Sequence, residues 1–486
     1  MPPFQLFPFP FWLVLAAIVF FAFRAWQQPE SALRLPMLAI LATVTTWYVG
    51  DALYNDYSDY LLEMDATSLS NAWWEVLGFL CAFMYLAPLI HRHFNRKYLG
   101  QPSHILSLIK YGGLKDDRLQ SQFDIFGRIS LGVWAALMLI ALIRTDFDFQ
   151  GLFMPYLGEK AEPWGRGRVG AGFDFLLAFA TYVQIALAAI FGLVLALSYR
   201  LSTFIPVLIA WFCALPSFIF DRTRSTMLAT VLPGFLYWVF LRLRTNLLVK
   251  MVILLAGFMV VSTWLKFIID YRGDVSISYA FALGAPLERK GLEDRKHLGL
   301  NMFEELGFIN SFITTGTYRP NWGQRYFAEI ANPIPRSIWP GKPMIGIDYA
   351  IARGQLLDVD SGDGTEVGAT ISTGMIGQGV VNFGRVLGPL AAASLMAFWA
   401  SVLARQDLLL IEPGRIFLYG LGLILTFNMG RDITLLVLYP FVFVYLALLG
   451  IKGWLYLHKA RALLKPNPET NNLASPPGLA ARRGRK

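Results

Sequence analysis

Apolar runs of close to twenty residues recur along this chain, and they limit its fold more than any other feature. A helix of about 20 apolar residues crosses the roughly 30 Å hydrocarbon core of a bilayer. Every backbone amide and carbonyl inside lipid must find its partner within the protein, so repeated runs of this length predict membrane-spanning helices. The composition agrees, because 56% of the 486 residues are hydrophobic and only 15% are charged. Soluble domains carry about 25% charged residues.

The apolar runs and the polar breaks between them predict an all-α polytopic membrane protein with about eleven spans. The expected spans cover residues 10–26, 34–50, 72–90, 126–143, 173–198, 201–219, 226–241, 247–269, 386–403, 414–429 and 432–452. They divide the chain into an N-terminal bundle (1–269), a large loop (270–385), a C-terminal group of spans (386–464) and a basic tail (465–486). The tail is rich in Pro, Asn and small residues, and we expect it to be disordered.

Lysine and arginine in the connections predict the orientation, because cytoplasmic loops carry an excess of both. They are frequent in 91–125, in 242–246 and in the tail, which fall on one side of the membrane in this span order. Segment 51–71, on the other side, has carboxylates but no Lys or Arg. We therefore expect the N-terminus and the loop 270–385 outside the cytoplasm, and the C-terminus inside it. The net charge of +9 follows from the same rule, so nucleic acid is not an expected partner.

The external connections nevertheless carry cations, which are normally depleted on that side. These cations are Arg166, Arg168, Arg222, Arg224, Arg272, Arg319, Arg325, Arg336 and Lys342. Arginines at the membrane edge suit a phosphate-bearing ligand, because the planar guanidinium binds two phosphate oxygens at once. For any single arginine, pairing with lipid headgroups or with nearby acids is the alternative.

Three parts of the large loop have features that predict local structure. Residues 301–314 carry an apolar stripe at helical spacing, which predicts a helix. The stretch "EIANPIPRSIWPGKP" (329–343) has four prolines. Proline fixes φ and removes a backbone donor, so this stretch would present Arg336 and Lys342 in few conformations. The apolar, glycine-rich residues 370–381 are a candidate for re-entering the membrane.

Four motifs in this region resemble the O-antigen polymerase (Wzy-type) family, the oligosaccharide repeat-unit polymerases of bacterial surface polysaccharides. They are "RSTML" (224–228), "EELG" (304–307), "WGQRYFAEIANPIPRSIWPGKP" (322–343) and "GATISTGMIGQGVVNFG" (368–384). The similarity covers residues 210–400, and the proline-rich segment with the later "NFG" is its most specific part. This chain departs from the family pattern at Gln378, where a carboxylate is expected before "NFG".

The resemblance implies a membrane-embedded glycosyltransferase of the GT-C type in the bacterial inner membrane. Such an enzyme takes undecaprenyl-pyrophosphate-linked oligosaccharides on the periplasmic face and joins their repeat units into a long polysaccharide. The expected partners are this lipid-linked substrate, the bilayer, and a chain-length regulator and a flippase of the same pathway. The resemblance implies no cofactor.

A transfer of this kind needs fixed cations at the leaving pyrophosphate and a base for the incoming hydroxyl. The cations expected to hold the pyrophosphate are Arg224, Arg272, Arg336 and Lys342, and Arg222 and Arg325 are further expected substrate-binding residues. Glu305, and after it Glu304, is the expected base, although acids at a helix start are also favoured by the helix dipole alone. The aromatic residues expected to stack on sugars, or else to pack the loop, are Trp322, Tyr326 and Trp339.

Two other functions stay open: an O-antigen ligase or other GT-C lipid-linked glycan transferase, and a polysaccharide transporter or flippase. In the related O-antigen ligases a histidine in the large external loop is the expected base, and His297 is the external histidine here. A transporter would show ionisable residues within its spans and broken helices in paired positions. No metal is expected, because the D-x-D patterns at 146–148 and 358–360 are only three residues long and His91 and His93 lack a third ligand.

Overall fold

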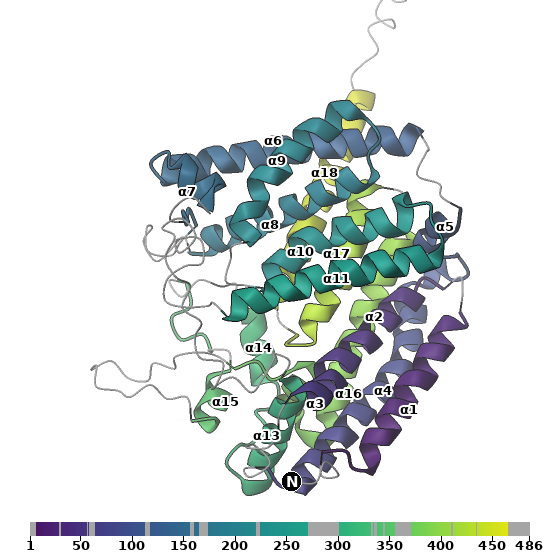
Figure 1. Ribbon diagram of the computed structural model, residues 1–486, viewed down its shortest axis with the longest axis vertical. Coiled ribbons are helices and arrows are strands. Elements are labelled where there is room, and N and C mark those ends of the chain that lie inside the picture. Colours follow the sequence, from purple (N-terminus) through teal and green to yellow (C-terminus); the bar gives the residue numbers. More distant parts are fainter. Residues whose placement is uncertain are drawn as a thin grey trace, which may run out of the picture.

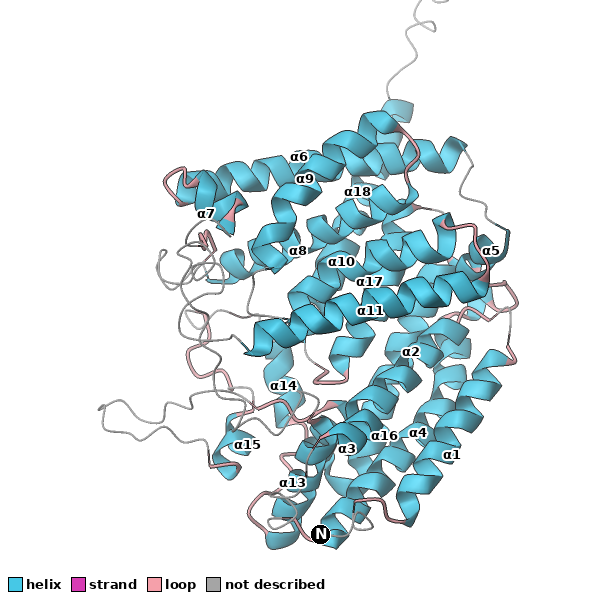
Figure 2. Ribbon diagram, viewed as in Figure 1, coloured by secondary structure: helices cyan, strands magenta, loops and turns pink. Residues whose placement is uncertain are grey.

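The structure is a computed structural model. It describes residues 6–28, 31–55, 57, 64–111, 117–155, 160–164, 174–219, 224–270, 301–331, 334, 338–343, 346–354, 371–409, 412–433 and 435–464. All regular structure in these ranges is helical (Figure 2). The helices are α1 (Phe9–Trp26), α2 (Arg34–Val44), η2 (Thr45–Gly50), α3 (Asp51–Tyr54), α4 (Ala66–Phe94), η4 (Arg96–Tyr98), α5 (His104–Tyr111), α6 (Asp117–Arg144), α7 (Phe149–Phe153), α8 (Asp174–Leu197), α9 (Leu201–Ile219), α10 (Arg224–Tyr237), η7 (Trp238–Arg242), α11 (Leu247–Asp270), α13 (Met302–Thr315), α14 (Gln324–Ala331), α15 (Ile347–Ala352), α16 (Met375–Leu408), α17 (Pro413–Met429) and α18 (Leu435–Leu464).

Seven stretches of helix are long and apolar enough to cross a membrane, so the chain is a polytopic membrane protein. They lie in α1, in the continuous helix formed by α2, η2 and α3, and in α4, α6, α8, α9 and α16. Shorter apolar helices lie in α10 with η7, in α11 and in α18. Each span that hydropathy predicts coincides with one of these helices or with α17. Several helices extend beyond the apolar run, because polar residues at their ends continue the backbone hydrogen bonding.

The connections gather at two ends of the molecule. Helices α13, α14 and α15 lie together at one end, with α5 on the opposite side (Figure 1). We call these the loop end and the α5 end. At the α5 end, Asn95 Nδ2 donates to the Ser401 carbonyl at 3.0 Å, and Gln120 Nε2 donates to the Leu197 carbonyl at 3.0 Å. Helix α5, in the connection after α4, also contacts η7, so the basic connections that follow α4 and η7 share one end.

The core of the loop end is built from α4, α13 and α16. α13 packs on both of the others, and its residues Phe303, Leu306 and Ile309 are buried. The ring of Phe303 stacks on Trp73 of α4 with ring centroids 4.0 Å apart. The helix predicted at 301–314 is therefore confirmed, and its apolar stripe faces the bundle.

α16 consists of two helices folded against each other at Gly384. This glycine has φ 76° and ψ −178°, a conformation that side chains with a Cβ rarely adopt. A Cβ on Gly379 would lie 2.2 Å from the Gly388 carbonyl oxygen, although on a straight helix these residues would be roughly 13 Å apart. Residues 375–383 therefore form a short buried helix that folds back onto the long span, which begins at residue 385.

Candidate active site at the loop end

Asp51 holds the start of α13 from the end of the second predicted span. The helix has no cap of its own, because the side chain of Asn301 at the N-cap position makes no capping hydrogen bond. Instead, Asp51 Oδ2 accepts from the backbone N–H of Phe303 at 2.7 Å and of Glu304 at 3.1 Å. A helix start leaves four amides unpaired, and a carboxylate also suits the positive end of the helix dipole. This contact fixes the position of Glu304 and Glu305.

Glu305, the expected base, is bonded on both carboxylate oxygens. The Tyr349 hydroxyl donates to Oε2 at 2.6 Å, and Arg353 Nη2 donates to Oε1 at 3.2 Å. Glu304 Oε1 lies 3.7 Å from the same guanidinium. Burial, and after it the charge of Glu305, raises the pKa of Tyr349, so its hydroxyl stays a donor. The ion pair connects α13 to the C-terminal end of α15. It also offsets part of the desolvation cost of burying the two glutamates.

Arg325, a predicted substrate-binding residue on α14, is buried inside the loop end with 3% of its side chain exposed. Its Nη2 donates to the Ile371 carbonyl at 3.3 Å and lies 3.7 Å from Asp432 Oδ1. The guanidinium lies over the backbone of Gly346, where an added Cβ would be 3.4 Å from Cζ. The loop before α16 and the connection between α17 and α18 therefore enclose this cation together with α14.

Several buried donors around this guanidinium have no hydrogen-bond partner among the residues that the structure describes. They are Nε and Nη1 of Arg325, the Tyr326 hydroxyl and Nε2 of Gln378. The Gln378 side chain is oriented by its Oε1, which accepts from the Ile433 N–H at 2.8 Å. Burial raises the pKa of Tyr326, so this hydroxyl also stays a donor. A buried unpaired donor costs about 1–3 kcal/mol, and an anionic oxygen is an acceptor that suits such donors.

The "NFG" residues at 382–384 build one wall of this cluster. Asn382 Oδ1 accepts from the Tyr326 N–H at 3.4 Å, and its Nδ2 donates to the Gln378 carbonyl at 2.7 Å. Phe383 stacks on the Tyr326 ring with centroids 6.1 Å apart. Gly384 then makes the turn back into the long span. Each residue of the motif thus helps to position the donors on Tyr326 and Gln378.

The structure does not place every predicted cation. Arg222, Arg272 and Arg336 lie outside the described residues, as does the side chain of Arg224 at the start of α10. Lys342 Nζ donates to the Ile334 carbonyl at 2.8 Å, which closes part of the proline-rich stretch on itself. Whether these residues bind a pyrophosphate stays a prediction.

The three predicted aromatic residues lie on or close to α14. Tyr326 belongs to the donor cluster, and Trp339 packs edge-on against Phe327 with centroids 6.1 Å apart. Trp322 comes just before the helix, with φ 52° and 75% of its surface exposed. Stacking on sugars stays a prediction for all three.

Few of the residues that the metal and ligase alternatives depend on lie in the described part of the chain. Asp148, in the first D-x-D pattern, caps α7 by accepting from the Gly151 N–H at 2.8 Å, whereas 358–360 and His297 lie outside the described residues. Within the ranges that the structure describes, no group of three or more His, Cys, Asp or Glu side chains could hold a metal ion.

Sequence reasoning missed four residues of the loop end. They are Asp51, Tyr349, Arg353 and Asp432. Asp432 lies where the last two predicted spans meet. A carboxylate at that position could have been recognised from the sequence as a site residue, because a charge at a span end needs a partner. Tyr349 and Arg353 gave no such signal, since their partner Glu305 lies more than 40 residues earlier in the chain.

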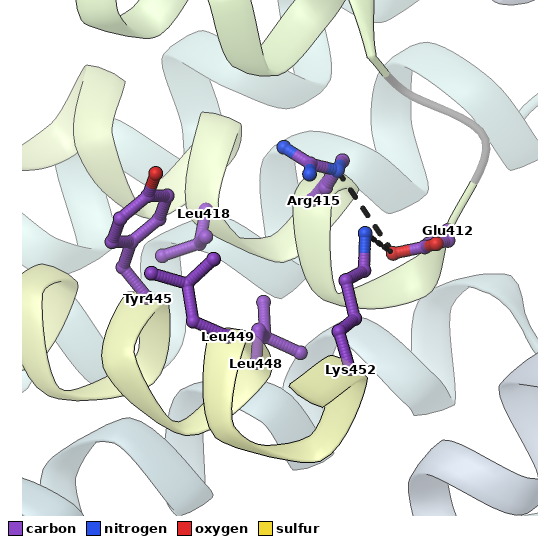
Figure 3. A pocket seen from close by; sticks show the side chains of 7 residues that line it. All are labelled: Glu412, Arg415, Leu418, Tyr445, Leu448, Leu449 and Lys452. Carbon is purple, nitrogen blue, oxygen red and sulfur yellow. Dashed lines mark ion pairs between the residues drawn. The ribbon is translucent and has the colours of Figure 1, made fainter. Parts of the chain in front are cut away.

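A surface pocket lies between the start of α17 and α18 (Figure 3). It is lined by Glu412, Arg415, Leu418, Tyr445, Leu448, Leu449 and Lys452. Lys452 Nζ lies 2.7 Å and Arg415 Nε lies 3.9 Å from Glu412 Oε2. The charges in this pocket are thus paired with one another, and nothing in it points to catalysis.

Comparison with family models, with curated proteins and with solved structures finds no match to this chain. Inferences about function therefore depend on the motifs and on the geometry of the loop end.

Proposed function

We propose that the protein is a membrane-embedded glycosyltransferase that polymerises polyprenyl-pyrophosphate-linked oligosaccharide units at the loop end. The observation that carries the proposal is the group of buried, unpaired donors around Arg325. A diphosphate offers several charged acceptor oxygens, and it is the part of such a substrate that must be held as it leaves. The resemblance of the surrounding motifs to O-antigen polymerases supports the same assignment.

The reaction breaks the bond between the anomeric carbon and the diphosphate oxygen, and the electron pair leaves with the diphosphate. A new bond forms between that carbon and a hydroxyl oxygen of the acceptor sugar, and the hydroxyl proton passes to a base. Donors aimed at the developing charge lower the barrier because they need no reorganisation. Arg325 and Tyr326 fill this role in the proposal.

Among the described carboxylates we assign Asp432 to take the proton, because it lies 3.7 Å from the Arg325 guanidinium and keeps 12% of its side chain exposed. Its Oδ1 also accepts from the N–H of Thr373 at 3.2 Å and from the Thr373 hydroxyl at 3.3 Å. Both oxygens of Glu305 are bonded within the protein, and its side chain is 3% exposed. In this proposal Glu305 positions α15, and Asp432 replaces it as the base.

The number of spans and their orientation in the membrane are also part of the proposal. The seven long spans, the three shorter apolar helices and α17 would all cross the bilayer in a GT-C-like arrangement of eleven spans. The α5 end, which carries the basic connections, would face the cytoplasm, and the loop end would face the periplasm. The active site then lies on the side where lipid-linked sugars are polymerised, in the bacterial inner membrane.

Deletion of the gene, followed by gel analysis of surface polysaccharide, tests this function. The deletion should keep single repeat units and lose long chains, and the wild-type gene should restore the ladder. Arg325→Lys should restore it poorly, because the two donors Nε and Nη1 are lost, whereas alanine at the exposed Arg319 should restore it fully. An unchanged ladder in the deletion strain, or loss of single units as well, would refute the proposal.

A further inference from the structure

Helix α14 has two chemically different faces. Arg325, Ala328 and Glu329 face inward and are buried, whereas Phe327 and Ile330 face outward with 53% and 66% of their surfaces exposed. The outward face is therefore apolar, and the described part of the chain leaves more than half of both side chains exposed. Large exposed apolar patches mark contact with a membrane or with another molecule.

The apolar surface continues on both sides of the helix. Trp322 precedes α14, and Ile334 and Ile338 follow it, with Ile338 75% exposed. We call Trp322, Phe327, Ile330, Ile334 and Ile338 the α14 patch. Trp322 has a backbone conformation in the left-handed region, which is unfavourable for a bulky residue, and 75% of its surface is exposed.

We propose that the α14 patch lies in the outer headgroup region of the bilayer, with its side chains inserted among lipid acyl chains. An amphipathic helix that exposes tryptophan and aliphatic residues binds the membrane interface in this way. Lys342, held on the Ile334 carbonyl at 2.8 Å, adds a cation next to the patch that suits phosphate headgroups.

Phe383 connects one end of the patch with the long span. An added Cβ on Gly323, the residue after Trp322, would lie 3.3 Å from the Phe383 ring. The long span begins two residues after Phe383, and its first turns expose Val386, Leu387 and Leu390. Exposed apolar residues thus lie on both sides of Phe383, and acyl chains are the occupant expected around a membrane-spanning helix.

This contact sets the depth of the donor cluster. A helix with its side chains is about 10–12 Å across, and an interfacial helix buries its apolar face by about 5–10 Å. Arg325, on the inward face of α14, would then lie at the level of lipid phosphates. The contact itself does not depend on the proposed transfer reaction, and it can hold even if that reaction does not occur.

Site-directed labelling tests the contact without any activity assay. Cys81 and Cys213 are replaced by alanine, and Ile330→Cys or Ile338→Cys is labelled with the environment-sensitive dye NBD. The matched control is Thr317→Cys, which is exposed at the same end but outside the patch. Each protein is reconstituted into phosphatidylcholine vesicles, with or without phosphatidylcholine that carries a doxyl quencher near its headgroup.

The dye at residues 330 and 338 should show blue-shifted emission, quenching by the doxyl lipid and little quenching by aqueous iodide. The dye at residue 317 should show the reverse. Equal iodide quenching at all three positions would overturn the proposal. Protection from both quenchers at 330 and 338 would overturn it too, because the patch would then be covered by protein, such as a second copy of the chain. The vesicles contain no polyprenyl lipid, so quenching there reports the bilayer and not the substrate.

Discussion

Removal of the Asp51 carboxylate should loosen the start of α13 before it affects the rest of the bundle. In Asp51→Ala the N–H groups of Phe303 and Glu304 lose the carboxylate oxygen that accepts from them at 2.7 and 3.1 Å. A hydrogen bond to a charged group contributes about 1.5–3 kcal/mol, and loss of an N-cap costs about 0.5–2 kcal/mol. Because these two contributions overlap, Asp51→Ala should destabilise the start of α13 by about 3 kcal/mol.

Hydrogen exchange followed by mass spectrometry measures this effect locally. A cost of about 3 kcal/mol corresponds to a roughly hundredfold increase in local opening, so peptides covering 302–306 should exchange that much faster. Asp51→Asn should have a smaller effect, because one acceptor oxygen remains. The matched control is Asp65→Ala, which removes a similar bond to the Ser68 N–H at 2.9 Å, but at the exposed start of α4. There the cost should be about 1 kcal/mol and confined to α4.

The result that would refute this reasoning is unchanged exchange in 302–306 in Asp51→Ala. The start of α13 would then be held by other contacts, and the carboxylate would be free for another role.

Two further substitutions test separate features. Gly379→Ala should greatly lower the yield of folded protein, because its Cβ would lie 2.2 Å from the Gly388 carbonyl oxygen. The control is Gly132→Ala, whose Cβ meets no atom within 4 Å and should leave stability unchanged or slightly raised. Normal yield for both variants would argue against the fold-back at Gly384. Tyr349→Phe should lower the free energy of unfolding by about 1–3 kcal/mol, because Glu305 loses a buried donor, and a thermal melt in detergent identical to wild type would contradict the contact.

The spans could be predicted from the sequence because hydropathy reports them directly. Lipid tolerates few polar residues, so each long apolar run had to be a helix. Helix α13 could be predicted for a different reason, because its apolar residues recur at helical spacing. The glycine-rich stretch before residue 384 was recognised as a candidate for re-entry. Its fold-back could not be predicted, because that depends on the close approach of Gly379 to Gly388 across a turn.

The candidate site was only partly predictable. Arg325 and Tyr326 belong to a motif, so the resemblance pointed to them. The sequence shows that Glu305 stands in the first turn of a helix, but it does not show that Arg353 and Tyr349 occupy both of its oxygens. Such pairings depend on how the loop packs over the bundle, and no local pattern reports them.

Tyr326→Phe tests the central claim, that the unpaired donors serve an anionic substrate. Among the described residues the Tyr326 hydroxyl has no hydrogen-bond partner, and the ring keeps its stack on Phe383 without it. The variant should therefore melt at the wild-type temperature. A lost hydrogen bond to a charged group costs about 1.5–3 kcal/mol, so transfer should slow by about ten- to a hundredfold. The measurement is chain extension by the purified protein in nanodiscs, supplied with a polyprenyl-pyrophosphate-linked oligosaccharide. Slower extension at unchanged stability is the predicted result, and extension at the wild-type rate would contradict the account.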